Sequence, residues 1–185
     1  MLLNKLSVLD KGFVAPVAFT GNGKLLQEIQ SHYFKTKANL KLLELSSACL
    51  VIKCPLFVQL NLSQYNLNII TTPSDNVEAY VPDVSMIEGE SLEDRQEIAR
   101  YIELTTEALL LNHKGLAMDG SSRFTAQLLT PITVYNELIV SGKLINWIQF
   151  IKQKQLPKEL ELYRKSVEDI LSVEWRNIDS LMRSM

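Results

Sequence analysis

Two short hydrophobic runs lie between residues 6 and 19, separated by Asp10-Lys11-Gly12, and the second run is interrupted by Pro16. Because proline is tolerated mainly on edge strands, this pattern predicts a hairpin at the edge of a sheet. A turn at Gly21-Asn22-Gly23 follows. Beyond it a short helix is predicted, because apolar residues recur at helical spacing at Leu25, Leu26, Ile29 and Tyr33.

The middle of the chain starts with a strand. Residues 48–53 are rich in β-forming side chains and predict a buried strand. Residues 56–62 fit a strand, on which Leu56, Val58, Leu60 and Leu62 alternate. They equally fit a helix with Leu56, Gln59, Leu60 and Ser63 on one face, opened by Pro55, so periodicity leaves both open. Residues 66–78 contain Pro, Asp and Asn and are predicted to be a loop.

A capping box is predicted at Ser91 to Asp94, where a helix should begin. Its apolar stripe consists of Ile98, Ile102, Thr105 and Leu109. His113 and Lys114 stand near its expected end, where positive charge suits the helix dipole, and Gly115 can terminate it. We therefore interpret His113 as a cap and not as a catalytic residue.

The remaining pattern predicts a helix over about 121–129 that stops at Pro131, a strand over 132–140, and a break at Ser141-Gly142. An amphipathic helix then carries Leu144, Trp147, Ile148 and Ile151. A last helix starts at Pro157, and its stripe, expected in the core or at a subunit contact, comprises Leu160, Val167, Ile170, Leu171, Trp175, Ile178 and Leu181. Without repeats or linkers, residues 1–185 are predicted to form one α+β domain.

Composition narrows the functional classes. Hydrophobic residues make up 46% and charged residues 22% of the chain, and the net charge is −2. This lacks the basic excess of a protein that grips free nucleic acid, and no apolar run approaches the roughly 18 residues of a membrane span. Cys49 and Cys54 are an odd number of positions apart on a strand and point to opposite faces, which prevents a bridge. With two distant histidines they make no metal set, so we expect buried thiols in a reducing cytoplasm.

Three groups of residues carry a family resemblance. The stretch Cys54 to Pro82 keeps Pro55, Phe57, Val58, Tyr80, Val81 and Pro82; residues 9–14 and Gly21-Asn22 form the second group; the third comprises residues 126–131, 135–136, 150–154 and 159–162. Over nearly its whole length the chain thereby resembles the flavin-dependent thymidylate synthases (ThyX). The resemblance implies a ThyX-like fold, in which helices pack on a central, mostly antiparallel sheet and a long helix ends the chain. It also favours a helix over residues 56–62.

The resemblance places candidate site residues. The family's Arg-His-Arg run, which contacts flavin and nucleotide, reads Gln64, Tyr65 and Asn66, and an Asn of the penultimate helix reads Gln149; these four are the cofactor candidates. The substrate candidates are Asn61, which replaces a Gln, and Gln127 and Lys154, which replace two dUMP-binding arginines. Thr71, Thr72 and Ser74 occupy a Ser/Asn/Glu loop, and an upstream flavin-side His reads Leu45. No catalytic residue is predicted, because the family reaction needs no protein nucleophile.

The replacements affect charge above all. A charge-assisted hydrogen bond contributes roughly 1.5–3 kcal/mol, so losing three arginine contacts would cost about 4–9 kcal/mol, or about a thousandfold to a millionfold in affinity. The main hypothesis is therefore an oligomeric binding or scaffold protein that kept the fold and lost catalysis. The alternative is an enzyme of pyrimidine nucleotide metabolism that methylates or modifies a dUMP-like ring at C5, using FAD.

The resemblance also implies partners. It implies FAD, against which the replaced motif argues, and a pyrimidine nucleotide such as dUMP. In an active enzyme a methylene group would pass from folate to C5 of dUMP, followed by a flavin hydride. The family assembles as a homotetramer with sites between subunits, so a homo-oligomer is expected. A hetero-oligomer with an intact relative is the other arrangement, because it would supply the missing arginines.

Overall fold

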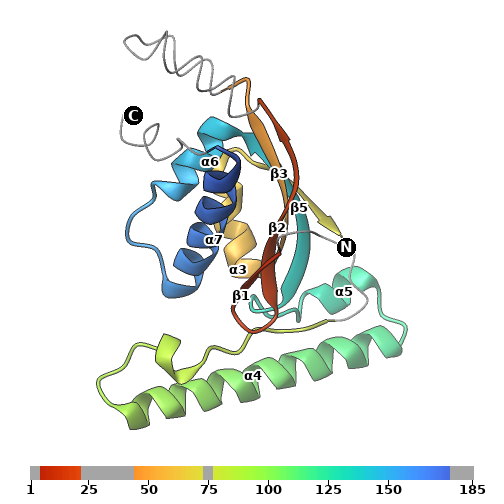
Figure 1. Cartoon of the computed structure of the whole chain (residues 1–185). Helices are drawn as coiled ribbons and strands as arrows, with labels where there is room; N and C mark the ends of the chain where they lie inside the picture. The colour runs from red at the N-terminus through yellow and green to blue at the C-terminus, as the bar shows by residue number, and fades with distance from the viewer. Residues whose placement is uncertain (1–4, 22–43, 73–76, 176–185) are drawn as a thin grey trace.

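The computed structural model describes residues 5–21, 44–72 and 77–175. Its strands are β1 (Leu6–Val8), β2 (Gly12–Thr20), β3 (Ser47–Pro55), β4 (Asn68–Thr72) and β5 (Tyr135–Lys143). In the described part of the chain they form one sheet in the order β1-β2-β3-β5-β4, with every neighbouring pair antiparallel. The predicted α+β class with an antiparallel sheet is confirmed (Figure 1).

The edge hairpin is also confirmed. Strands β1 and β2 pair with Val8 opposite Gly12, and Leu9 in the turn has a positive φ of 57°. The pairing of β2 with β3 shifts register between Pro16 and Ala18. A proline has no N–H to give to the ladder, so the irregularity falls where the sequence predicts an interruption.

Three helices cover one face of the sheet: α3 (Leu56–Leu62), α6 (Leu144–Ile151) and α7 (Lys158–Glu174) (Figure 1). The helical alternative for residues 56–62 is therefore correct, and a single turn η1 (Ser63–Tyr65) extends it. The core between sheet and helices includes Leu50, Ile52, Leu138, Val140, Trp147, Ile148, Val167 and Leu171. Trp175 is buried just beyond α7, as expected of the last stripe.

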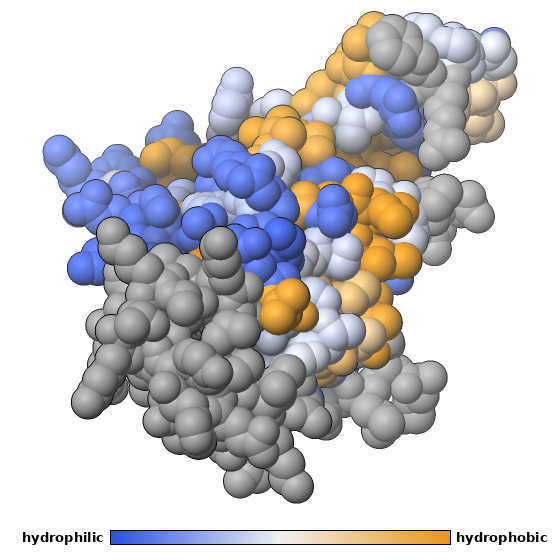
Figure 2. All heavy atoms as spheres, turned by 90° about the horizontal axis from the view of Figure 1, so that it is seen from above, coloured by the Kyte–Doolittle hydropathy of each residue, from blue (hydrophilic) through white to orange (hydrophobic). Residues whose placement is uncertain are grey.

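The opposite face of the sheet is only partly covered. Residues alternate in burial along β3, with Leu50 and Ile52 buried and Val51 between them half-buried. Val51, Ile139 and Ile70 are directly opposed across three strands and so share this face. Seen from above, hydrophobic side chains gather toward the side that carries the strands and hydrophilic ones toward that of α6 and α7 (Figure 2).

Helix α4 (Leu92–Met118) lies across one end of the molecule, after the single turn η2 (Val84–Met86) (Figure 1). The predicted capping box opens it, because Ser91 accepts from the Asp94 amide and Asp94 accepts from the Ser91 amide. Of its predicted stripe, Ile102, Thr105 and Leu109 line a hollow of about 400 Å³ against Pro131 and neighbouring residues, while Ile98 is exposed. Among the residues of α4 only Thr106 is buried, so most of this helix faces outward in the described chain.

Two predicted boundaries are wrong because glycine was taken as a break. Helix α4 runs past Gly115 to Met118, and Gly120, with a φ of 76°, follows its end. Strand β5 starts at Tyr135 and continues through Ser141 and Gly142. A Cβ at position 142 would overlap Leu67, so this glycine permits close packing inside a strand and does not end it.

The loop predicted for residues 66–78 is wrong in its first part, because Asn68–Thr72 form β4 at the edge of the sheet. The helix predicted over 121–129 shrinks to α5 (Arg123–Gln127). The helix predicted near residues 25–33 and the outer stripe residues Ile178 and Leu181 lie outside the described residues. No helix in the described ranges combines the length and apolarity needed to cross a membrane.

Candidate functional site

A pocket of about 710 Å³ opens where α3, β4, the start of β5, α5 and the C-terminal turns of α4 meet. The polar residues that line it include Gln59, Thr71, Thr72, His113, Gln127 and Asn136. The apolar lining residues include Leu56, Val77, Ala117, Ala126 and Val134. Among the described lining residues there is no Lys, Arg, Asp or Glu. This mixture of apolar surface and convergent neutral polar groups is typical of sites for small organic ligands.

Backbone hydrogen bonds hold two walls of the pocket together. The first amides of a helix have no partner within the helix, and here Leu56 N donates to Val134 O at 2.9 Å and Phe57 N to Ile132 O at 3.1 Å. The segment that enters β5 therefore satisfies the start of α3. This arrangement places Gln59, one turn into α3, beside the first residues of β5.

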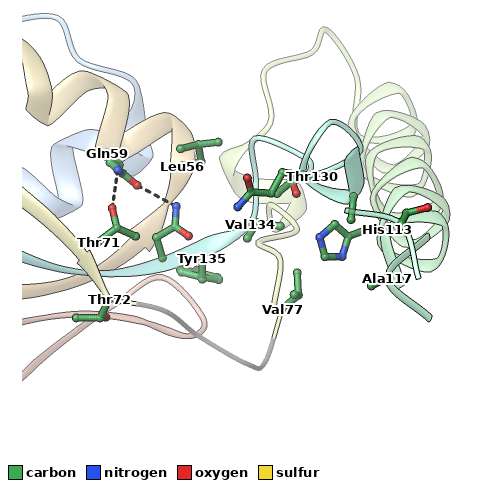
Figure 3. A pocket seen from close by; sticks show the side chains of 14 residues that line it. Leu56, Gln59, Thr71, Thr72, Val77, His113, Ala117, Thr130, Val134 and Tyr135 are labelled. Carbon is green, nitrogen blue, oxygen red and sulfur yellow. Dashed lines mark hydrogen bonds between the residues drawn. The ribbon is translucent and has the colours of Figure 1, made fainter. Parts of the chain in front are cut away.

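Gln59 connects α3 to two strands. Its Nε2 donates to Thr71 Oγ1 at 3.2 Å, and its Oε1 accepts from Asn136 Nδ2 at 2.9 Å (Figure 3). Each residue comes from a different element, so the chain of hydrogen bonds fixes the relative position of β4, α3 and β5 at the pocket. It also orients the Asn136 amide within the lining.

Tyr135 anchors the floor of the pocket to the edge hairpin. Its hydroxyl donates to Asp10 Oδ1 at 2.5 Å, and the Lys53 ammonium lies 5.7 Å from its ring centroid. Burial, followed by the hydrogen bond to Asp10, raises the pKa of Tyr135 above its usual range, so the phenol is a neutral donor. Lys53 forms an ion pair with Glu78, and this hydrogen bond lowers the pKa of Glu78.

His113 contributes a polar group that the described chain leaves without a partner. Its imidazole projects from α4 toward the side of the pocket formed by Thr130 and Val134 (Figure 3). The Nδ1 atom is buried and has no hydrogen-bond partner among the described residues. Leaving such an atom buried and unpaired costs roughly 1–3 kcal/mol, so the ring is placed here at an energetic cost.

One of the three substrate candidates lies in this pocket. Gln127, at the end of α5, lines it. Asn61 is on α3 two residues after Gln59, with Oδ1 buried and unpaired in the described chain, but it does not line the pocket. Lys154 is exposed beyond the end of α6. A single chain therefore does not bring these three residues together.

The four cofactor candidates belong to a different surface, formed by η1 and α6. Tyr65 packs edge-on against Phe150 with ring centroids 5.3 Å apart, and Asn66, in the left-handed conformation, accepts from Asn146 Nδ2 through its carbonyl. Gln64, Asn66 and Gln149 are exposed. Leu45, at the position of the family's flavin-side His, is also exposed. Tyr65 thus has a packing role, and the other side chains point outward.

Several pocket residues escaped the sequence analysis. His113 was interpreted as a helix cap, but the last turn of α4 is closed by backbone bonds from Asp119 N to Gly115 O and from Ser121 N to Leu116 O. Gln59 was noted only as one member of a helix face, and Asn136 only as part of a strand motif. The sequence offers one signal for Gln59 and Asn136, because each places a neutral amide within a largely apolar run.

No protein-family model matches this sequence, and none of the curated proteins does either. Among solved structures, the chain is similar to the UMP/dUMP methylase PolB from Streptomyces cacaoi bound with 5-Br dUMP. The TM-score is 0.73 at 15% sequence identity, covering 91% of this chain and 93% of that one. The same enzyme bound with 5-Br UMP gives a TM-score of 0.71 at 16% identity, covering 91% and 92%. The chain therefore shares its fold with a UMP/dUMP methylase over more than nine-tenths of both chains.

Proposed function

We propose that this protein is a ThyX-like enzyme of pyrimidine nucleotide metabolism that modifies a UMP- or dUMP-like ring, with methylation at C5 as the reaction. The fold shared with a UMP/dUMP methylase supports this alternative better than the inactive scaffold that the replaced charges first favoured. One observation carries the proposal. The family resemblance of the sequence makes Gln127 a substrate candidate, and Gln127 lines the 710 Å³ pocket of a chain that shares the fold of a UMP/dUMP methylase.

The chemistry of the pocket suits a uracil ring. The ring presents carbonyl acceptors at C2 and C4 with an N–H donor between them, and an amide such as Gln127 can both donate and accept along that edge. Leu56, Ala126 and Val134 supply apolar surface for the faces of the ring and for a methyl group. The chain's own residues would bind and orient the ring, and the one-carbon unit would come from a co-substrate.

FAD is a separate matter, because the residues that the resemblance assigns to it do not fit the group within one chain. Gln64, Asn66 and Gln149 are exposed, and Tyr65 is packed on Phe150. None of them lines the described pocket, and none offers charge to a pyrophosphate. FAD therefore stays a prediction that an absorbance spectrum of the purified protein checks, and no step of the chemistry is derived through it.

We also propose a homo-oligomer, in which a second copy covers the outer face of α4. Leu104, Leu111 and Met118 recur at seven-residue intervals and Tyr101 precedes Leu104 by three, so the four side chains fall on one heptad stripe, as in the seam of a helix pair. Leu104 is 56%, Leu111 69% and Met118 87% exposed. A helix of 27 residues is about 40 Å long, and two copies that pair antiparallel would bury the same stripe on each.

Isothermal titration calorimetry with UMP, dUMP and, as a purine control, dAMP tests the proposed function. We expect binding of UMP or dUMP but not of dAMP. We expect Gln127→Ala to weaken binding about tenfold, the usual effect of losing one buried hydrogen bond. Gln149→Ala is the matched control. It also removes an exposed glutamine amide, but one outside the pocket, so it should change affinity less than about twofold.

Chemistry is tested with dUMP carrying tritium at C5. Release of tritium in the presence of methylene folate and reduced flavin is expected of an active enzyme, and Gln127→Ala should lower the rate. A wild-type protein that binds neither UMP nor dUMP contradicts the proposal. Binding without tritium release supports the binding-protein hypothesis instead.

A further inference from the structure

The imidazole of His113 is the feature of the pocket that neither the sequence analysis nor the fold likeness assigns. It stands near the C-terminal end of α4, a helix in which only Thr106 is buried. Yet Nδ1 of His113 is buried in the pocket lining, without a partner in the described part of the chain. An outward-facing helix thus places one polar ring inward at the pocket.

A structural role does not account for this ring. The carbonyls of Gly115 and Leu116 at the end of α4 are already satisfied by the amides of Asp119 and Ser121. His113 is therefore not needed as a cap. A buried polar atom without a partner destabilises the ligand-free chain, and in native proteins such atoms call for a specific explanation.

The rest of the pocket lining also suits a ligand. Gln127 and Thr130 come from α5 and the turn after it, and Asn136, which is held by Gln59, comes from β5. These groups are neutral donors and acceptors, as an uncharged heterocycle requires. The described lining contains no Asp or Glu that could form an ion pair with His113.

We propose that Nδ1 of His113 hydrogen-bonds directly to the pyrimidine base and sets the orientation of its ring in the pocket. This rests on the proposed function and adds a specificity-determining residue to it. The partner on the base is a ring carbonyl or the ring N–H, both of which lie along the edge that Gln127 also reaches. The ligand then satisfies the atom that the described part of the chain leaves unpaired.

Two substitutions at His113 test this with dUMP and UMP as probes. His113→Leu removes the polar atom at similar size, and we expect affinity to fall about tenfold or more. The melting temperature of the ligand-free protein should stay equal or rise, because an unpaired buried nitrogen is gone. His113→Asn places an amide near the position of Nδ1, and we expect it to keep affinity within about threefold of the wild type.

The results distinguish failure of the role of His113 from failure of the proposed function. If the wild type binds dUMP or UMP and His113→Leu binds it equally well, the role of His113 is overturned and the proposed function survives. If the wild type binds neither, the proposed function itself fails. A lower melting temperature for His113→Leu without a loss of affinity shows a structural role and also overturns the inference.

Nitrogen-15 NMR tests the same inference with His113 left in place, so it does not depend on whether a His113 variant folds. The chain has two histidines, so a His32→Gln variant assigns the imidazole signals. On addition of dUMP we expect the Nδ1 signal of His113 to shift more than its Nε2 signal. Saturating dUMP that leaves the His113 signals in place contradicts the inference.

Discussion

Asn136 donates a hydrogen bond from Nδ2 to Oε1 of Gln59 at 2.9 Å, although 77 positions separate the two residues. Gln59 continues the chain of bonds to Thr71, so one side chain joins α3 to the neighbouring strands β4 and β5 at the pocket. The pocket therefore depends on a tertiary contact between amides, and this contact can be removed without touching the hydrophobic core.

We expect Gln59→Leu to lower the free energy of unfolding by about 1 kcal/mol, because Asn136 is part-buried and loses its acceptor. Affinity for the pyrimidine should fall as well, since the Asn136 amide is no longer oriented. Urea denaturation and calorimetry measure the two effects. Gln64→Leu, at an exposed position, is the control and should change both by much less. A variant with unchanged stability and affinity would show that the bridge has no role.

The proposed oligomer gives a second prediction. Leu104→Glu combined with Leu111→Glu places two charges in the exposed apolar stripe of α4, so we expect the protein to dissociate into monomers. Size-exclusion chromatography with light scattering measures the mass. Val173→Glu on α7 is the control, because Val173 is exposed outside this stripe and should leave the mass unchanged. A monomeric wild type would refute the assembly.

A third prediction concerns pH. The hydrogen bond from Lys53 lowers the pKa of Glu78 below 4.5, so the unfolded chain binds this proton more readily than the native state. The stability from the pair is therefore present above about pH 4.5 and is lost as the pH falls through the lowered native pKa. Because Glu78 is partly exposed, we expect Glu78→Gln to cost at most about 1 kcal/mol at pH 7.

The cost of Glu78→Gln should be smaller at pH 3 than at pH 7, as measured by urea denaturation at both values. In a Lys53→Met background the same substitution should cost little at either pH, because the partner is already absent. An equal cost of Glu78→Gln at pH 7 and pH 3 would assign its effect to packing and not to charge.

Two glycines give opposite predictions. A Cβ at Gly12 would lie 2.6 Å from Val8 O and 2.8 Å from Lys53 O and would overlap the Tyr163 hydroxyl, so Gly12→Ala should destabilise by about 1–3 kcal/mol. Gly115 lies inside α4, and no atom of the described residues lies within 4 Å of such a Cβ, so in a single chain Gly115→Ala should stabilise by about 0.5–1 kcal/mol. Thermal unfolding compares both variants with the wild type. Gly115 stands between Leu111 and Met118 of the proposed contact stripe, so a Gly115→Ala that destabilises the assembled protein would support coverage of this part of α4 by the second copy.

The elements predicted best are those specified by neighbouring residues. The Ser91–Asp94 capping box needs only the spacing of three residues along one helix start, and the structure shows both of its hydrogen bonds. The alternating burial of Leu50, Ile52 and Cys54 follows from the two-residue period of a strand. Resemblance added what periodicity left open, namely that residues 56–62 form a helix.

The errors arose where a partner far along the chain decides the outcome. Residues 68–72 have ordinary turn-like composition around them, and they become a strand because β5 offers an unpaired edge. Gly142 stays within β5 because it pairs with Ala48 of β3, and Leu67 occupies the space that a side chain would need there. Neither condition is visible in a local window.

The amino-acid sequence by itself determined the helix starts and the alternation of strands with helices, because periodicity and capping are local, and its resemblance to a family supplied the antiparallel sheet and Gln127 as a candidate. Only the tertiary structure decided that Gln59, His113 and Gln127 share one pocket while Gln64, Tyr65 and Asn66 lie elsewhere. The physical reason is that a pocket forms where the ends of several elements meet. Strand register and the path of α4 set that meeting, and both depend on contacts between residues distant in the chain.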